Sequence, residues 1–286
     1  MRETITLALP MVALASLVAS GLACGAGPEE ESVESSPEAI ADPIQSAPWM
    51  SRISSVIERE REKIRNAEGR EGILAEERHY SVFDEELIIR DFFQDRRGGF
   101  FLDVGCAWPV RASNTYYLEK HLGWTGIGID ALAEYGPAWT AKRPNSRFFS
   151  YLVTDRSGVK EIFFKSPDSG LSSTQQDLAS GKIFGLDLEP EKVEIHTITL
   201  DDLLDREGVT KIDLLAMDIE GHEPKALAGF DIERFRPELA VIERPLHPEE
   251  IEKSEVYRYF ERHGYQLIEK YRPFDTVNLY FERKTP

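Results

Sequence analysis

Short apolar runs recur from residue 100 onward, separated by segments of mixed polarity. The runs at 100–104, 125–129, 212–217 and 239–242 contain few polar residues, and each is followed by a glycine or an acid. Apolar runs of this length without a polar face indicate strands that are buried on both sides of a sheet. Further strands are predicted at 148–153, 161–164, 193–200, 265–270 and 277–282.

Helical periodicity fills the intervals between these runs. The clearest pattern spans 84–95, where Leu87, Ile88 and Phe92 belong to a wide apolar face. Gly98-Gly99 is expected to close this helix, because glycine tolerates the left-handed conformation. Strands that alternate with helices predict an α/β fold, with a mostly parallel sheet covered by helices on both faces. Other helices are predicted at 115–121, 201–206, 224–228 and 249–263.

The N-terminal part of the chain follows a different pattern. Residues 7–23 are uncharged and rich in Leu, Ala and Val, and Cys24 follows Gly21-Leu22-Ala23. This arrangement resembles a bacterial lipoprotein signal, so residues 1–24 are predicted to be a signal or anchor segment of a membrane-associated or exported protein. If Met50 is the true start, the protein would instead be cytoplasmic.

Two further segments connect this N-terminus to the predicted fold. Residues 25–48 contain six acidic residues and no basic residue, among Pro, Ser and Ala. A segment so poor in large apolar residues does not offset its ordering entropy, so we predict a disordered tether that acts as an acidic flexible linker. Residues 49–79 are predicted to form a charged helical lead-in, and residues 80–286 the globular domain.

Composition narrows the function classes. The chain has 34 Lys and Arg against 51 Asp and Glu, a formal net charge of −17. This balance argues against a nucleic-acid partner, because phosphate binding needs clustered basic residues. Hydrophobic residues make up 41% of the chain, enough for a substantial core. Two cysteines form no disulfide framework, and no Cys/His spacing is typical of a zinc site.

Acidic residues recur where the predicted strands end. In a parallel sheet these ends form the crevice in which ligands bind. A carboxylate there costs desolvation energy unless it is paired or contacts a ligand, so the recurrence predicts a shared cleft, although some of the acids would cap helices. The residues concerned are Asp103 with Gly105, Asp130, Asp155, Asp218 and Glu243.

The first two strand ends suit a nucleoside cofactor. Gly105 would let the backbone approach a ligand closely, and Asp130 is placed to bond ribose hydroxyls. The loop 103–109 has one glycine where a dinucleotide fingerprint needs three, which disfavours a nicotinamide-dependent oxidoreductase. A cofactor without phosphates, such as S-adenosylmethionine, fits better.

Several segments resemble the FkbM-type methyltransferase family. They are Phe101 to Gly105 with Ser113 to Glu119, Gly123 to Asp130, Leu200 to Leu203, and Ile212 to Glu223, of which the last is the most specific. Tyr80-Ser81 with 84–88 is similar to the family's lead-in helix, and 169–173 to a shared loop. The resemblance covers about residues 80–282. It implies an S-adenosylmethionine-dependent methyltransferase with a Rossmann-like seven-stranded sheet, which methylates a hydroxyl of a sugar or natural product.

The resemblance also implies roles by position. Asp103 and Gly105 would line the methionine side of the cofactor, Asp130 would bind the ribose and Asp155 would lie beside the adenine. Asp218 would face the transferring methyl group. Ala107-Trp108-Pro109 departs from the small residues more usual in the first loop.

Methyl transfer to a hydroxyl requires a base that removes the proton. Asp218 or Glu220 is the first candidate, with His222 or Glu223 as the alternative, although His222 could instead face solvent and Glu223 could stabilise a helix start. Several carboxylates could hold Mg²⁺ against the acceptor oxygen, but the spacing specifies no ligand set and no metal site is predicted.

The expected partner is therefore a small-molecule or glycan hydroxyl acceptor, with a possible membrane tether through the N-terminus. One conflict stays open, because S-adenosylmethionine is made and used in the cytoplasm, whereas Cys24 and its context suggest export. The alternative is an exported or membrane-tethered Rossmann-like binding protein without methyl transfer.

Overall fold

The structure, a computed structural model, describes residues 80–82, 84–182, 185–243, 248–275 and 277–284. The predicted signal or anchor segment, acidic linker and helical lead-in lie outside these residues, so these stay predictions. Within the described ranges, no helix is both long enough and apolar enough to span a bilayer.

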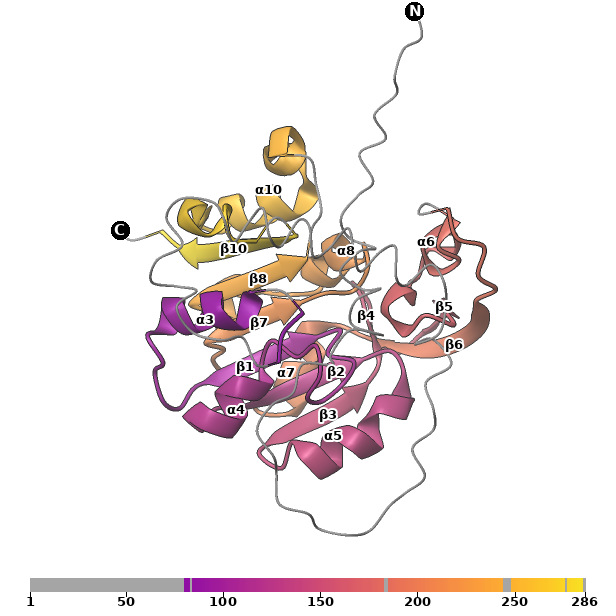
Figure 1. The fold of residues 1–286 in the computed structure, drawn as a ribbon, viewed down its shortest axis with the longest axis horizontal. Coiled ribbons are helices and arrows are strands. Elements are labelled where there is room, and N and C mark those ends of the chain that lie inside the picture. Colours follow the sequence, from indigo (N-terminus) through magenta and orange to yellow (C-terminus); the bar gives the residue numbers. More distant parts are fainter. Residues whose placement is uncertain (1–79, 83, 183–184, 244–247, 276, 285–286) are drawn as a thin grey trace, which may run out of the picture.

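A central sheet of seven strands runs through the molecule in the order β3-β2-β1-β7-β8-β10-β9 (Figure 1). Its five parallel strands are β1 (Phe100–Val104), β2 (Thr125–Asp130), β3 (Ser146–Ser150), β7 (Leu214–Met217) and β8 (Leu239–Glu243). β10 (Asn278–Arg283) runs antiparallel between β8 and β9 (Tyr265–Leu267). The predicted Rossmann-like, mostly parallel sheet is confirmed.

Helices cover both faces of this sheet, as predicted. Leu102 and Val104 of β1 pack into one core cluster with apolar side chains of α7 (Leu200–Arg206), α8 (Glu223–Ala228), α9 (Ile232–Phe235) and α10 (Glu255–Arg262). Phe101 packs on the opposite face with α3 (Glu85–Phe93) and α4 (Tyr116–Leu122). The sequence did not predict α9, or α5 (Gly136–Lys142), which places Trp139 against Gly128 of β2.

A second, smaller sheet was not predicted. β5 (Lys160–Lys165) and β6 (Glu191–Ile198) are antiparallel, and β4 (Leu152–Val153) lies parallel to β6. Together with α6 (Gln176–Ala179), these strands form a small lobe beyond the carboxyl ends of the parallel strands (Figure 1). The strand predicted at 148–153 is therefore divided between two sheets. The chain leaves the central sheet at Tyr151, whose amide donates to the Asp130 carbonyl at 3.0 Å, and Thr154 already bonds to Ile198 of β6.

The end of α3 also differs from the prediction. The helix ends at Phe93, and Gln94 and Asp95 take the left-handed conformation expected of the glycines, with φ of 50° and 51°. The Arg90 guanidinium stabilises this turn, because it donates to both carboxylate oxygens of Asp95 at 2.9 and 3.0 Å. Gly99 is required for another reason, since a Cβ there would lie 2.8 Å from the Trp124 ring.

The predicted helix at 249–263 is likewise two elements. A 3₁₀-helix covers Pro248–Lys253, and Ser254 then caps α10 by accepting a hydrogen bond from the Tyr257 amide at 3.1 Å. The hydroxyl at this position satisfies one of the free N–H groups of the helix start and fixes where α10 begins.

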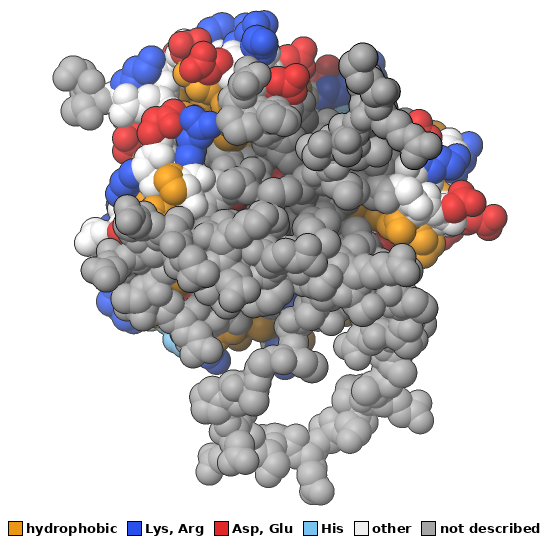
Figure 2. All heavy atoms as spheres, turned by 45° about the horizontal axis from the view of Figure 1, so that its top comes forward, with side chains coloured by type: hydrophobic (Ala, Val, Ile, Leu, Met, Phe, Trp, Pro, Cys, Tyr) orange, Lys and Arg blue, Asp and Glu red, His pale blue; other side chains and the backbone are white. Residues whose placement is uncertain are grey.

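On the face seen in Figure 2, charged side chains of both signs are interspersed where described residues are visible. Hydrophobic side chains gather on the side of the small lobe in the same view. Ile162 of β5 is 46% exposed and is the one large hydrophobic side chain classed as exposed among the described residues. The apolar positions of the central sheet are therefore covered by the helices.

Gly105 lies where the ends of β1 and β7 meet. Its φ is +82°, and a Cβ on this residue would lie 1.7 Å from the carbonyl oxygen of Asp218. The glycine is thus required by the contact between two loops of the protein itself, whereas the sequence indicated only a close approach of the backbone to a ligand.

We expect Gly105→Ala to lower the free energy of unfolding by roughly 3 kcal/mol or more, because a backbone atom blocks the new methyl group. Gly158→Ala is the matched control, since Gly158 has φ of +80° but nothing within 4 Å of a Cβ. Its expected loss is about 1–2 kcal/mol, from the left-handed conformation alone. Urea unfolding of both variants measures the difference, and equal losses would contradict the steric account.

Candidate functional site

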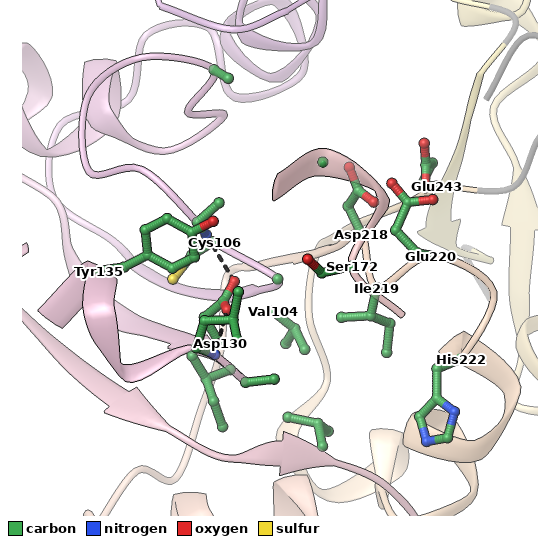
Figure 3. A pocket seen from close by; sticks show the side chains of 18 of the residues that line it. Val104, Cys106, Asp130, Tyr135, Ser172, Asp218, Ile219, Glu220, His222 and Glu243 are labelled. Atoms are coloured by element: carbon green, nitrogen blue, oxygen red, sulfur yellow. Dashed lines mark hydrogen bonds between the residues drawn. The ribbon is translucent and has the colours of Figure 1, made fainter. Parts of the chain in front are cut away.

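A cavity opens at the carboxyl ends of β1, β2, β7 and β8 (Figure 3). Its volume is about 1080 Å³ including its open mouth. The position follows from the strand order, because β2 lies on one side of β1 and β7 on the other, and ligands bind where the order reverses. The small lobe contributes Gly170, Ser172 and Thr174 to the lining.

Asp130 lies at one end of this cavity and is held by two backbone amides. Ala107 donates to Oδ2 at 3.1 Å and Leu132 donates to Oδ1 at 2.8 Å, as the dashed lines in Figure 3 show. Burial raises the pKa of Asp130 to about 6, although the hydrogen bonds from the two backbone amides lower it. Each oxygen keeps a free lone pair, so Asp130 is a fixed acceptor for hydroxyl groups of a ligand.

The walls near Asp130 are apolar and aromatic. The Trp108 and Tyr135 rings meet edge to face, 5.9 Å apart. Trp108 lines the cavity and is only partly buried, so it belongs to the cavity wall and not to the fully buried core. The apolar side chains of this wall are Trp108, Leu132, Tyr135, Leu152, Val153 and Phe163. They offer a flat apolar surface to the ring system of a ligand that contacts Asp130.

Asp103 faces an adjoining recess and not the main cavity. Its carboxylate accepts a hydrogen bond from the Thr115 hydroxyl at 2.6 Å, and Arg143 donates to the same hydroxyl oxygen at 3.0 Å. The recess is also lined by Asn114, and it meets the cavity at Gly105. Burial raises the pKa of Asp103 to about 6, although the Thr115 bond and the Arg143 charge lower it.

Asp155 is exposed and does not line either of these two spaces. The cause is the division of the predicted third strand, because β4 turns toward β6 before Asp155 is reached. Tyr151, Leu152 and Val153 line the cavity instead. The structure thus does not bring Asp155 together with the other residues that the sequence predicted.

Three carboxylates meet at the other end of the cavity, and we call them the acid cluster. They are Asp218 after β7, Glu220 in the turn that follows, and Glu243 at the end of β8. One oxygen of each lies within 4.8 Å of the others, and Figure 3 shows the side chains pointing toward one another. Asp218 is open to the cavity, whereas Glu220 and Glu243 are buried.

Two members of the acid cluster have raised pKa values. Burial raises the pKa of Asp218, and burial together with the negative charge of Asp218 raises the pKa of Glu243 well above its usual range. Asp218 is the member of the pair that is open to the cavity.

The backbone that carries Glu220 is unusual. Glu220 and Gly221 both have positive φ, 53° and 85°. The Glu223 carboxylate accepts hydrogen bonds from the Ile219 and Gly221 amides, both at 3.1 Å, and burial raises its pKa to about 7. Glu223 does not line the cavity, so it is a positioning residue that holds the turn.

His222 lines the cavity but lies apart from the acid cluster. Its Nδ1 is 3.0 Å from the Thr174 hydroxyl, and its ring points away from the three carboxylates in Figure 3. Only 6% of the residue is exposed, so the alternative of a solvent-facing histidine is wrong. Burial lowers the pKa of His222, which makes the ring neutral near pH 7.

Some lining residues carried no signal in the sequence. Asn278 of β10 lies beside the acid cluster because β10 pairs with β8, with Asn278 opposite Glu243. Its amide donates to Asp275 at 2.9 Å and to Glu85 of α3 at 3.3 Å. Residues so distant along the chain become neighbours only through the strand order.

The charge of the cavity is of one sign. No Lys or Arg occurs among the described residues that line it, whereas the acids Glu85, Asp130, Asp218, Glu220 and Glu243 do. A space of this kind repels phosphate groups and favours uncharged hydroxyls or positive charge. The fold and the cavity therefore define a Rossmann-like protein with a ligand cavity that suits a nucleoside cofactor without phosphates.

Comparison with known proteins identifies the family. Residues 103–267, more than half of the chain, match the methyltransferase FkbM domain. The chain is 23% identical over 227 residues to the 31-O-demethyl-FK506 methyltransferase FkbM of Streptomyces tacrolimicus, which covers 68% of this chain and 87% of that protein. A crystal structure of a TehB-like SAM-dependent methyltransferase from Corynebacterium glutamicum is 16% identical, covers 81% of this chain and 100% of that chain, and has a TM-score of 0.39.

The chain belongs to the FkbM methyltransferase family. It is an S-adenosylmethionine-dependent methyltransferase, as the motifs at 101–105 and 212–223 predicted. Family membership thus favours the enzyme over the alternative of a binding protein without methyl transfer.

The raised pKa of Asp103 has a consequence for stability. The folded protein binds this proton up to about pH 6, against an ordinary value of 3.8. Between these values the folded state holds more protons than the unfolded state, so stability falls as the pH rises. We expect the free energy of unfolding of the wild type, relative to Asp103→Asn, to fall by up to about 3 kcal/mol from pH 4 to pH 7.

Chemical denaturation at a series of pH values measures this difference. Asp187→Asn is the control, because Asp187 is exposed, and its profile should parallel that of the wild type. If the free energy of unfolding changes with pH in the same way in the wild type and in Asp103→Asn, the raised pKa of Asp103 is contradicted.

Proposed function

We propose that this enzyme transfers the methyl group of S-adenosylmethionine to a hydroxyl oxygen of a sugar or natural-product-like small molecule. The observation that carries the proposal is the acid cluster, which provides a carboxylate at the opposite end of the cavity from Asp130. The name of the Streptomyces relative, a 31-O-demethyl-FK506 methyltransferase, supports oxygen as the acceptor atom.

The residues present fit this cofactor. When bound, S-adenosylmethionine supplies an electrophilic methyl group on a positively charged sulfur. Asp130 would accept hydrogen bonds from the ribose hydroxyls, since both of its oxygens are fixed by backbone amides and retain free lone pairs. Leu132 and Leu152 would enclose the adenine, and the recess beside Asp103 and Gly105 would hold the methionine part.

The acid cluster would orient and deprotonate the acceptor. Asp218 is open to the cavity and is the first candidate for the base, with Glu220 beside it. A raised pKa makes a carboxylate a better proton acceptor near neutral pH, and burial has this effect on Asp218. His222 is a weaker candidate because its ring points away from the cluster.

Substitution of Asp218 tests this assignment. We expect Asp218→Asn to reduce kcat for hydroxyl methylation by roughly 10²- to 10⁴-fold, the range typical for loss of a general base, with little change in cofactor affinity. Transfer of labelled methyl groups by the purified full chain to a panel of sugars and hydroxylated natural products measures the rate.

The control in this assay is Asp187→Asn, an exposed carboxylate outside the cavity, which should keep the wild-type rate. Methylation of the panel at nitrogen but not at oxygen would contradict the proposed acceptor. An unchanged rate in Asp218→Asn would remove Asp218 from the role of base.

A further inference from the structure

We propose that Asp218, Glu220 and Glu243 bind a divalent cation, Mg²⁺ or Mn²⁺, which holds the acceptor hydroxyl oxygen. This inference rests on the proposed function of the same cavity and adds a cation to it. Four observations support it, namely the spacing of the oxygens, the burial of Glu243, the charge of the cavity and the access to Asp218.

The spacing of the acid cluster suits a single ion. Two oxygens bound to one Mg²⁺ at about 2.1 Å are at most about 4.2 Å apart, and the limit for a larger ion at about 2.4 Å is about 4.8 Å. One oxygen from each of the three carboxylates lies within 4.8 Å of the others. This value equals the limit for the larger ion, and binding of Mg²⁺ would need side-chain rotations that bring the three oxygens closer together.

Glu243 provides an independent observation. Only 3% of the residue is exposed, and its Oε1 has no hydrogen-bond partner within the described residues. β8 pairs with β7 and β10 on its two sides, so the strand holds Glu243 at the inner end of the cavity. A buried carboxylate oxygen without a partner is unfavourable, and a cation would supply the missing interaction.

The charge of the cavity points the same way. Among the described lining residues, no Lys or Arg offsets the acid cluster. A cation bound by the three carboxylates would offset this negative charge.

The cation would leave room for the acceptor. Three carboxylate oxygens provide half of the six or so ligands that Mg²⁺ prefers, and the remaining positions are taken by water or substrate. Asp218 is the member of the cluster that is open to the cavity, so the free positions lie on that side. An acceptor hydroxyl bound there would be oriented and would lose its proton more readily.

Direct measurement of cation binding tests the inference. The full chain is treated with EDTA, dialysed and titrated with Mn²⁺ without cofactor or acceptor, and free Mn²⁺ is followed by electron paramagnetic resonance. We expect one Mn²⁺ per chain and displacement by Mg²⁺. Glu243→Gln and Glu220→Gln should each weaken binding by roughly tenfold or more.

Glu261→Gln is the matched control, because Glu261 is exposed on α10, and its affinity should equal that of the wild type. Titration of each variant with S-adenosylmethionine verifies that its cavity is folded. If Glu243→Gln fails this check, Glu220→Gln and Asp218→Asn take its place.

Two results would overturn the inference. One is the absence of saturable binding by a chain that binds S-adenosylmethionine, and the other is binding that the cluster variants leave unchanged. If either result is found and the enzyme still methylates hydroxyls at full rate in EDTA, the inference fails and the proposed function stands. Binding of Mn²⁺ at the cluster without hydroxyl methylation of any acceptor would contradict the proposed function alone.

Discussion

The contact between Gly105 and the carbonyl oxygen of Asp218 is the constraint on which the site depends. It brings the loop after β1 so close to the loop after β7 that no side chain fits between them. The parallel pairing of the two strands sets the direction of this approach, because the Asp218 amide donates to the Val104 carbonyl at 2.9 Å. The loop after β1 bonds to Asp130 through Ala107, and the loop after β7 carries Asp218 and Glu220. This contact therefore fixes the distance between the two ends of the cavity.

The site concentrates carboxyl groups where a folded protein normally avoids them. Burial raises the pKa of Asp103, Asp130, Asp218, Glu223 and Glu243, which means that each ionised group is less stable here than in water. A buried carboxylate is tolerated when it has partners, and backbone amides or hydroxyls provide them for Asp103, Asp130 and Glu223. In the acid cluster, Oε1 of Glu243 has no such donor among the described residues.

Much of the fold could be predicted from the sequence. β1, β2, β7 and β8 are buried on both faces, and their continuous apolar runs revealed them together with the acids or glycine at their ends. Strands were predicted at 161–164 and 193–200, but the small sheet was missed because no local pattern contains the pairing of β5 with β6. α9 escaped prediction because four residues are too short for a helical pattern.

The site was predicted less completely than the fold. The ends of β2 and β7 placed Asp130 and Asp218 in the cavity, and Asp218 and Glu220 were expected near the reaction. Their meeting with Glu243 depends on the pairing of β7 with β8, which no local pattern contains. Asp155 was misplaced for the opposite reason, because a single bend at Tyr151 moves the chain into another sheet.

The central claim is that Asp130, and not Asp155, holds the nucleoside cofactor. Calorimetric titration of the full chain with S-adenosylmethionine, beside Asp130→Asn and Asp155→Asn, tests it most directly. The account predicts binding that Asp130→Asn weakens by roughly 10- to 100-fold, the effect of a lost charged hydrogen bond, and that Asp155→Asn leaves unchanged. Binding weakened by Asp155→Asn but not by Asp130→Asn, or no binding by the folded wild type, would contradict it.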